Sequence, residues 1–399
     1  MVGCHGLRRR FVAFVSPLLS LALVPPANAT ESANPTPPAN ATESANPTPP
    51  ASATQPPTPG RRALAATAAL VPGAVVHGAG HYVLGKKDTA LDLLLFEGLG
   101  LGMILGGGSA IVFTGASRYV VGPAAAVTIL GVGVFGTSLL ADIYGSVSSD
   151  PGAARRRRSL VPRLETEIGY RRVEDVQFAH HDFLVEGLRL NQGRFGVGLL
   201  GMFSVTGNNA RYRGELGYRF IDENANPDSR SSDRLELTLG FVRHLYAADR
   251  FSMTSGEVSL LGRYDLARVG DTLSGSFAEF AVGYARGAVA YDLIGQRVPN
   301  DPYDLLLARF GFGVRLRGRS ARGSEALLYY DHRHDDFAAG LKVTGLGSGA
   351  PGHFGFQTKW FFNSSVGVLA EAAVGSAWVF GGSLLLRQSQ PESAKERMP

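Results

Sequence analysis

The chain of 399 residues has room for two folded units and a tail, and its composition is unusual because 51 glycines accompany only 18% charged residues. A net charge of +5 does not indicate a nucleic-acid surface, since much of the excess lies in one arginine run at 155–158 and other arginines alternate with acidic residues. The mean hydropathy of +0.04 is high for a soluble protein and low for a helical membrane protein. Such a value is typical of transmembrane β-barrels.

Residues 1–29 have the pattern of a secretory signal peptide. Three arginines at 8–10 precede an apolar run at 11–24, and Ala29 closes a small-x-small cleavage site, so we expect cleavage after Ala29. Cys4 is the only cysteine and leaves with the signal. The mature chain is therefore expected to have no disulfide, no thiol nucleophile and no thiolate metal site.

Residues 30–61 read as a disordered linker. The segment is rich in Pro, Thr, Ala and Asn, and the twelve letters at 27–38 recur unchanged at 39–50. Such a composition cannot bury a core and favours extended polyproline II, which predicts a periplasmic spacer.

Residues 62–150 are rich in Gly and Ala and predict a small apolar helical region. The stretch 120–140 carries no charge and is long enough to cross a bilayer, whereas Asp92 and Glu97 weaken the preceding apolar stretch as a membrane span. We expect these helices to plug the barrel lumen or to dock on its periplasmic side. The alternative is that residues 89–141 span the inner membrane.

Glycines at helical spacing indicate where these helices approach each other. Gly98, Gly102 and Gly106 recur every four residues, and small residues at this spacing allow close helix packing. We therefore expect that face to pack closely against other protein surface, either a neighbouring helix or the barrel wall.

From residue 160 onward the hydrophobic pattern has a period of two, which is the period of β-strands. Charged residues or glycines alternate with apolar residues, as at 211–220 and 309–317. The polar set should face a wet lumen, and the apolar set, with Leu237 and Phe312, should face lipid. The expected lumen-facing residues are Arg211, Arg213, Glu215, Arg234, Glu236, Arg309 and Arg315.

We predict an antiparallel transmembrane β-barrel of about 12 strands (range 10–14) at residues 160–387, followed by a polar tail at 388–399. The segments are long enough for tilted membrane strands. Aromatic residues near the strand ends suggest interfacial girdles, namely Tyr264, Tyr284, Tyr303, Tyr329, Trp360 and Phe362. One feature departs from this pattern, since the last predicted strand ends on Arg387 and not on an aromatic residue.

Two polar clusters are weak candidates for metal binding. Asp331, His332, His334 and Asp335 lie in a predicted hairpin loop, and imidazoles and carboxylates both suit divalent cations. The alternative interpretation is a solvated charged turn. His77 and His81 are a weaker pair, because two glycines between them disfavour a helix that would present both imidazoles on one face.

No constellation in the sequence predicts an enzyme. No serine or threonine stands in a spacing that marks it as the partner of a histidine and an acid, and the glycine-rich stretches lack the lysine of a phosphate loop. We therefore expect no catalytic residue and no cofactor.

The segment 72–146 resembles the helical lead-in of uncharacterised envelope proteins of the myxobacterial type. The residues that carry the resemblance are Pro72-Gly73, His77, Gly80-His81-Tyr82, Gly85-Lys86-Lys87, Thr89-Ala90 and Glu97-Gly98-Leu99-Gly100. The resemblance implies an apolar helical region before an outer-membrane barrel, with no established activity.

These features together predict a Gram-negative outer-membrane barrel that acts as a pore or an envelope scaffold. Its expected partners are membrane lipid and small solutes that pass through the lumen, and no nucleic acid. Two alternatives remain open: a barrel enzyme acting on envelope lipid, and an inner-membrane helical anchor that carries a periplasmic β-domain.

Overall fold

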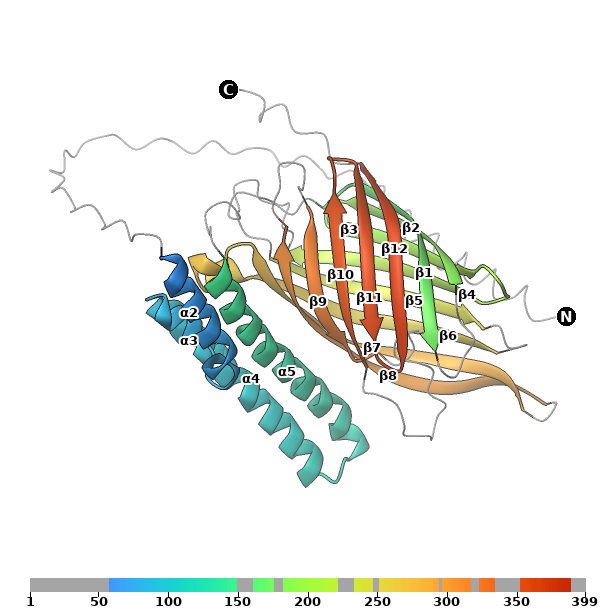
Figure 1. Ribbon diagram of the computed structural model, residues 1–399. Helices are drawn as coiled ribbons and strands as arrows, with labels where there is room; N and C mark the ends of the chain where they lie inside the picture. Colours follow the sequence, from blue (N-terminus) through green and yellow to red (C-terminus); the bar gives the residue numbers. More distant parts are fainter. Residues whose placement is uncertain are drawn as a thin grey trace, which may run out of the picture. The chain divides into compact units, whose positions relative to one another are not determined.

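The computed structural model describes residues 57–148, 161–175, 182–221, 233–246, 251–293, 296–316, 323–333 and 352–388. The expected signal peptide, most of the expected linker and the polar tail beyond residue 388 lie outside these ranges. The described residues form a group of helices followed by a barrel of strands (Figure 1).

The barrel consists of twelve antiparallel strands joined in sequence order. They are β1 (Leu164–Asp175), β2 (Asp182–Gln192), β3 (Phe195–Ser204), β4 (Ala210–Ile221), β5 (Arg234–Leu245), β6 (Ser252–Asp265), β7 (Ser276–Leu293), β8 (Gln296–Arg315), β9 (Glu325–Asp331), β10 (His353–Phe361), β11 (Val366–Val374) and β12 (Ala377–Gln388). β1 pairs with β12 from Leu164 opposite Gln388 to Asp175 opposite Ala377. Closure leaves the sheet without an edge, and it confirms the predicted barrel of twelve strands.

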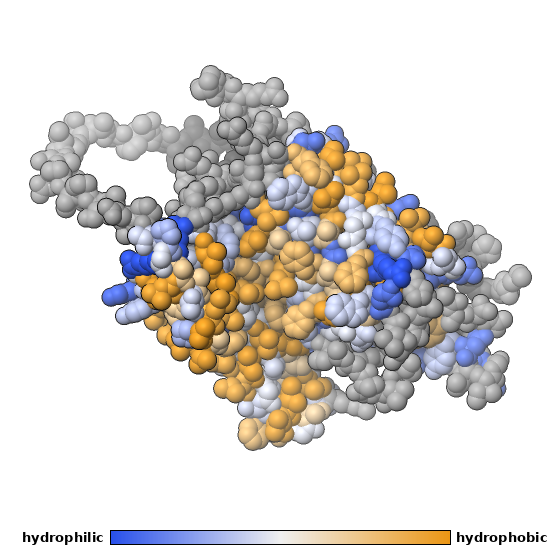
Figure 2. Space-filling model, in the orientation of Figure 1, coloured by the Kyte–Doolittle hydropathy of each residue, from blue (hydrophilic) through white to orange (hydrophobic). Residues whose placement is uncertain are grey.

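The two faces of the wall follow the period of two in the sequence. On β4, Arg213 and Glu215 line the interior, whereas Tyr212, which precedes Arg213, is exposed on the outer face. Apolar side chains occupy the outer face around the barrel, where they are exposed in the protein alone (Figure 2). They include Ile168, Leu184, Leu199, Leu239, Leu260, Tyr284, Phe356, Trp360, Val368, Trp378 and Leu384. A closed strand wall with this outer surface satisfies its backbone within the sheet, as a membrane requires.

Two of the six aromatic residues expected in the outer girdles face the interior. Tyr329 shares the inner face of β9 with Glu325 and Leu327, and its ring lies 4.2 Å from the guanidinium carbon of Arg309. Tyr303 has the same strand parity as Arg309 on β8. The expectation was wrong for Tyr329 because an aromatic side chain near a strand end also fits a lumen when an arginine can stack on it, and it was wrong for Tyr303 because its strand parity puts it on the face of Arg309.

The helical part comprises α2 (Pro59–Leu70), the short helices η1 (Pro72–Ala74) and α3 (Ala79–Val83), and two long helices, α4 (Lys87–Phe113) and α5 (Arg118–Val147). The first helix begins within the expected linker, where Thr58 caps it by accepting a hydrogen bond from Arg61 N at 3.4 Å. α4 and α5 form an antiparallel hairpin, and both are long and apolar enough to cross a membrane. At 27 and 30 residues they extend about 40 and 45 Å.

The two helices contact each other through different glycines from those expected. A Cβ atom added to Gly100 would lie 2.7 Å from Phe135 N, and one added to Gly107 would lie 2.6 Å from Ala124 O. Gly131 on α5 is equally close to α4. In contrast, the expected contact residues Gly98, Gly102 and Gly106 have no neighbour within 4 Å of an added Cβ. The expected glycine face is therefore wrong, because it lies away from the helix–helix contact.

The hairpin packs against the outer wall of the barrel at β7 and β8. A Cβ atom on Gly133 of α5 would lie 2.5 Å from the Phe310 side chain, and the rings of Tyr144 and Phe312 are 6.1 Å apart. Phe312, expected to face lipid, is on the outer face but is covered by α5. The residues that line the lumen come from the barrel part of the chain alone. The structure therefore does not confirm a lumenal plug formed by the described helices.

Candidate functional site

The lumen encloses a cavity of about 490 Å³ that residues from all twelve strands line. Its lining carries charges of both signs in equal number. Among the described lining residues the acids are Glu165, Glu167, Glu215, Glu236, Glu257, Glu279, Glu325 and Asp331, and the bases are Arg189, Arg213, Arg234, Arg263, Arg309, Arg333, Lys359 and Arg387. These eight acids and eight bases give the described lining no net formal charge.

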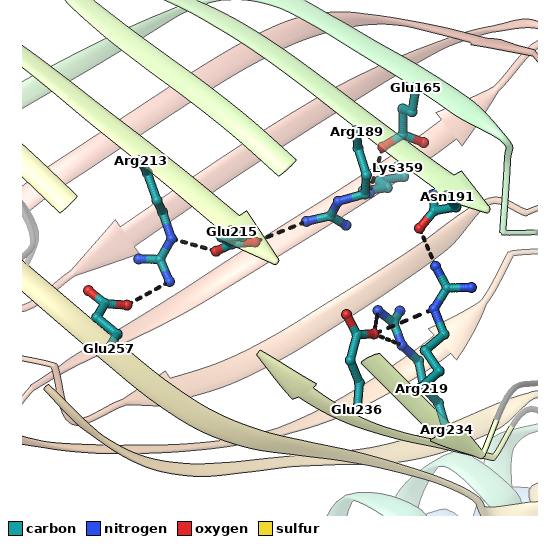
Figure 3. Close-up of polar contacts among 10 residues, drawn as sticks. All are labelled: Glu165, Arg189, Asn191, Arg213, Glu215, Arg219, Arg234, Glu236, Glu257 and Lys359. Carbon is teal, nitrogen blue, oxygen red and sulfur yellow. Dashed lines mark hydrogen bonds and ion pairs between the residues drawn. The ribbon is translucent and has the colours of Figure 1, made fainter. Parts of the chain in front are cut away.

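A chain of ion pairs runs along the inner wall from β2 through β4 to β6, and a separate pair joins β10 to β1 (Figure 3). Arg213 on β4 pairs with Glu215 on the same strand and reaches Glu257 on β6, with Nη2 3.0 Å from Oε2. Arg189 on β2 approaches the other side of Glu215 at 3.7 Å. Lys359 on β10 pairs with Glu165 on β1 at 3.3 Å. The acidic groups are thus compensated by bases from strands two or three places away around the barrel, and for Glu215 also from its own strand.

A second group lies toward the barrel end where β4 finishes and β5 begins. Arg234 Nε donates to Glu236 Oε2 at 2.6 Å, and Arg219 Nε lies 3.6 Å from the same oxygen. Arg219 also donates to the side-chain oxygen of Asn191 on β2, as Figure 3 shows. Arg219 is buried, so its charge is neutralised within the wall and not by bulk water.

A third group occupies the wall formed by β6 to β9. Arg263 donates to Glu279 at 3.0 Å and to Glu325 at 2.9 Å, and Arg309 lies 3.7 Å from Glu279. The guanidinium of Arg263 also stacks on the ring of Phe277, 4.1 Å from its centroid. Stacking on the ring holds the guanidinium in place and leaves its N–H groups able to donate to the carboxylates.

The segment after β9 contributes one cation to the lumen. Arg333 is buried and donates to Glu257, the same carboxylate that Arg213 contacts. Its backbone N donates to Asp331 Oδ1 at 2.9 Å, which turns the chain inward after the strand. Arg333 therefore narrows the lumen at the end where β9 finishes.

Five of the expected lumen residues line the cavity, namely Arg213, Glu215, Arg234, Glu236 and Arg309. Arg315 pairs with Asp265 at 3.3 Å near the end of β8. Arg211 is buried on β4, opposite His244 of β5. Sequence reasoning did not single out Glu257, Arg263 and Glu279, although their alternation along β6 and β7 is the same signal that identified the others.

The described part of the predicted hairpin cluster has no arrangement for a metal. Asp331 accepts a backbone hydrogen bond, and His332 Nδ1 lies 3.0 Å from the Tyr330 hydroxyl. His334 and Asp335 lie outside the described residues. Among the residues that are described, no group of three or more His, Cys, Asp or Glu side chains is placed to hold a metal ion.

The other predicted pair, His77 and His81, belongs to a polar cluster buried at the base of the hairpin. Gly78 has a φ of 91° and separates the two histidines, so they do not share one helix face. Asp142 of α5 accepts hydrogen bonds from Gly78 N (3.0 Å), Gly80 N (3.1 Å) and His81 N (3.1 Å). The Asp142 carboxylate thereby fixes the segment that contains Gly78, Gly80 and His81 to α5.

His77 contacts the opposite side of the same cluster. Its backbone N donates to Glu97 Oε2 of α4 at 2.8 Å, and its Nδ1 lies 2.5 Å from Ser138 Oγ of α5. Burial lowers the pKa of His77, although the nearby carboxylates of Glu97 and Asp142 act in the opposite direction. The imidazole is therefore held neutral to a lower pH than in an unfolded chain.

His81 links this cluster to the barrel. Its Nδ1 lies 2.6 Å from Asp142 Oδ1, and its Nε2 lies 2.9 Å from the hydroxyl of Thr272. Thr272 lies in η3 (Asp271–Leu273), within the connection between β6 and β7. A Cβ atom on Gly145 would lie 2.4 Å from His81 Nε2, so only glycine leaves room for the imidazole there. The carboxylate, imidazole and hydroxyl form one chain of hydrogen bonds from helix to barrel.

Comparison with known proteins finds similarity only at the level of structure. No family model and no curated protein matches the chain. The KdgM porin aligns with 7% identity and a TM-score of 0.34, over 56% of this chain and 98% of its own. The outer membrane protein Omp33 of Acinetobacter baumannii aligns with 10% identity and a TM-score of 0.30, over 58% and 100%.

The translocator domain of the autotransporter NalP from Neisseria meningitidis gives 12% identity and a TM-score of 0.33, over 58% of this chain and 89% of its own. Identities and scores this low do not extend to a substrate or a mechanism. The resemblance of residues 72–146 to myxobacterial envelope proteins receives no support from these comparisons.

Proposed function

We propose that this protein is a Gram-negative outer-membrane barrel whose lumen passes small polar solutes. The observation that carries the proposal is the contrast between the two faces of one closed wall. The outer face is apolar around the barrel, and the inner face carries paired acids and bases. A soluble periplasmic domain would expose this outer belt to water, whereas a membrane barrel places it against lipid.

The balanced lining favours solutes without net charge. Rings of like charge make a pore select ions of the opposite sign, whereas this lumen carries acids and bases in equal number and pairs most of its acids with bases, as at Glu257, Glu279 and Glu165. Zwitterions and neutral polar molecules can exchange hydrogen bonds with both kinds of group. A strongly charged solute would have to displace one partner of a pair.

Conductance across a planar lipid bilayer tests this proposal. The purified protein should form channels whose reversal potential in a salt gradient stays close to zero. Arg333→Ala should raise the conductance, because it removes the buried side chain that reaches Glu257 inside the lumen. Glu174→Gln, at an exposed pair with Arg172, is the matched control and should leave it unchanged. A closed barrel without channels, or a reversal potential far from zero, would contradict the proposed role.

One observation favours a second candidate function, an enzyme acting on envelope lipid. Thr272, His81 and Asp142 follow the order of nucleophile, base and orienting acid that hydrolases use. In such a step His81 Nε2 would take the hydroxyl proton while Thr272 Oγ1 attacks an ester carbonyl. The leaving alcohol would then take that proton, and water would release the acyl group from Thr272.

A phospholipid ester assay in vesicles separates this candidate from a purely structural link. Thr272→Val should abolish hydrolysis, and Thr272→Ser should retain it, because serine keeps the hydroxyl. If the hydrogen bond only joins the helices to the barrel, wild-type protein will release no fatty acid. In that case Thr272→Val will lower only the unfolding temperature.

A further inference from the structure

The α4–α5 hairpin presents an apolar face that no part of the described chain covers. Leu95, Leu99 and Leu105 are 62%, 55% and 68% exposed, and they lie on α4 away from the barrel. Phe113 at the tip is 87% exposed. In water such a face would be unfavourable over most of the length of the helix.

The charged residues of the hairpin lie toward its two ends, with Arg118 at the tip where α5 begins. Asp92, Glu97 and Asp142 all lie near the base, where α4 begins and α5 ends. The stretches 98–117 and 119–141 contain no charged residue. About 20 uncharged residues in a helix extend about 30 Å, which is the thickness of the hydrocarbon core of a bilayer.

The hairpin also runs along the barrel wall in the direction that a membrane span needs. Consecutive strands alternate in direction, so the connection between β6 and β7 lies at the barrel end where β1 starts and β12 finishes. The base of α5 contacts that connection, with the Tyr144 hydroxyl 3.1 Å from Ser274 O. Halfway along the helix, Gly133 contacts Phe310, which lies farther from that end of the barrel than Phe312.

The surface that α5 covers belongs to the same outer belt that is exposed elsewhere on the barrel. Phe310 and Phe312 lie on the outer face of β8, as Trp360 does on β10. Figure 2 shows hydrophobic side chains over the hairpin and over the adjoining barrel surface. The apolar surface of the hairpin thus continues that of the barrel.

We propose that the α4–α5 hairpin is inserted beside the barrel in the same bilayer, and that lipid acyl chains are the partner of its outer face. This inference rests on the proposed membrane location of the barrel. The paired Gly100 and Gly131 allow the two helices to pack without polar contacts, and the cluster around Asp142 holds their base at the membrane boundary.

Quenching of tryptophan fluorescence by brominated phosphatidylcholine tests this inference in the full mature chain. The two native tryptophans, Trp360 and Trp378, are on the outer wall and report whether the barrel itself is in lipid. In a background in which both are replaced by Phe, Leu105→Trp should be quenched as strongly as the native pair. Thr238→Trp, which lies on the lumen wall, should stay unquenched.

The quenching results separate a failure of the hairpin inference from a failure of the proposed membrane location. If the native pair is quenched and Leu105→Trp is not, the hairpin lies outside lipid or under another protein copy, and the inference is wrong while the barrel proposal stands. If the native pair is not quenched, the proposed membrane location itself fails. Leu99→Trp provides a second probe on the same face, and a heat-dependent gel shift verifies that each variant has folded.

Discussion

The barrel and the helical hairpin both place charged side chains in apolar surroundings, and they compensate those charges differently. In the lumen most carboxylates are paired with guanidinium groups, and Glu279 contacts both Arg263 and Arg309. At the hairpin base Asp142 is compensated by three backbone N–H groups and one imidazole. The lumen network is therefore distributed over several charges, whereas most hydrogen bonds of the hairpin base go to one carboxylate, Asp142, and Glu97 accepts one from His77 N.

Asp142→Ala should cause the largest loss of stability, because four hydrogen-bond donors lose the carboxylate that accepts from them. We expect a loss of about 3–5 kcal/mol, the typical consequence of removing one partner from a buried charged network. Hydrogen exchange at the amides of Gly78, Gly80 and His81 should accelerate accordingly. Ser146→Ala is the control on the same helix, since that buried hydroxyl has no partner in the described structure. Equal exchange in the two variants would show that Asp142 does not hold the loop.

Glu279→Gln should have a smaller effect, because the amide oxygen still accepts one hydrogen bond. Two guanidinium groups would remain beside a neutral side chain, and we expect a loss of about 2–3 kcal/mol. Urea unfolding in lipid vesicles, followed by tryptophan fluorescence, measures the change. Glu174→Gln is the matched control, because its pair with Arg172 is exposed and should contribute little. A loss as large as that of Asp142→Ala would mean that the lumen network is not distributed.

Gly100→Ala and Gly102→Ala compare two faces of one helix. The added methyl group of Gly100→Ala would lie 2.7 Å from Phe135 N, and overpacking of this kind costs about 1–3 kcal/mol. The methyl group of Gly102→Ala meets nothing within 4 Å and should stabilise α4 by up to about 1 kcal/mol through helix propensity. Thermal unfolding followed by circular dichroism distinguishes the two, and opposite signs are the expected result. Destabilisation by both variants would indicate a partner on the Gly102 face.

The smallest expected effect is the pH dependence that His77 contributes to the hairpin base. Burial lowers its pKa in the folded protein, so the unfolded chain binds the proton more readily. The stabilising contribution is complete above the ordinary pKa of about 6.5 and is lost as the pH falls below it. His77→Asn should flatten the fall of the unfolding temperature between about pH 7 and pH 5. An identical slope in wild type and variant would assign the pH dependence to other groups.

The barrel was predictable from sequence because its two faces alternate residue by residue. This alternation alone assigned Arg213 and Glu215 to the lumen, and it also gave the number of strands. Tyr303 and Tyr329 were misplaced because they were assigned from their position near strand ends and not from this alternation, which gives them the faces of Arg309 and Glu325. The contact of Tyr329 with Arg309 joins two strands, so the sequence of a single strand does not encode it.

The hairpin was less predictable because glycines occur on more than one face of α4. Gly98, Gly102 and Gly106 repeat at a spacing that favours packing, yet the contact uses Gly100 and Gly107. The partner helix decides between these faces through residues such as Phe135 and Ala124. The link from His81 to Thr272 spans 191 residues, so no local pattern could indicate it.

Sucrose-gradient fractionation of the envelope tests most directly whether the barrel and the hairpin share one outer membrane. The whole mature chain should sediment with outer-membrane markers, with the segments before and after the arginine run at 155–158 still joined. Finding the intact chain with inner-membrane markers would contradict this prediction, because α4 and α5 would then act as an inner-membrane anchor. Finding the hairpin and the barrel in different fractions would contradict it equally.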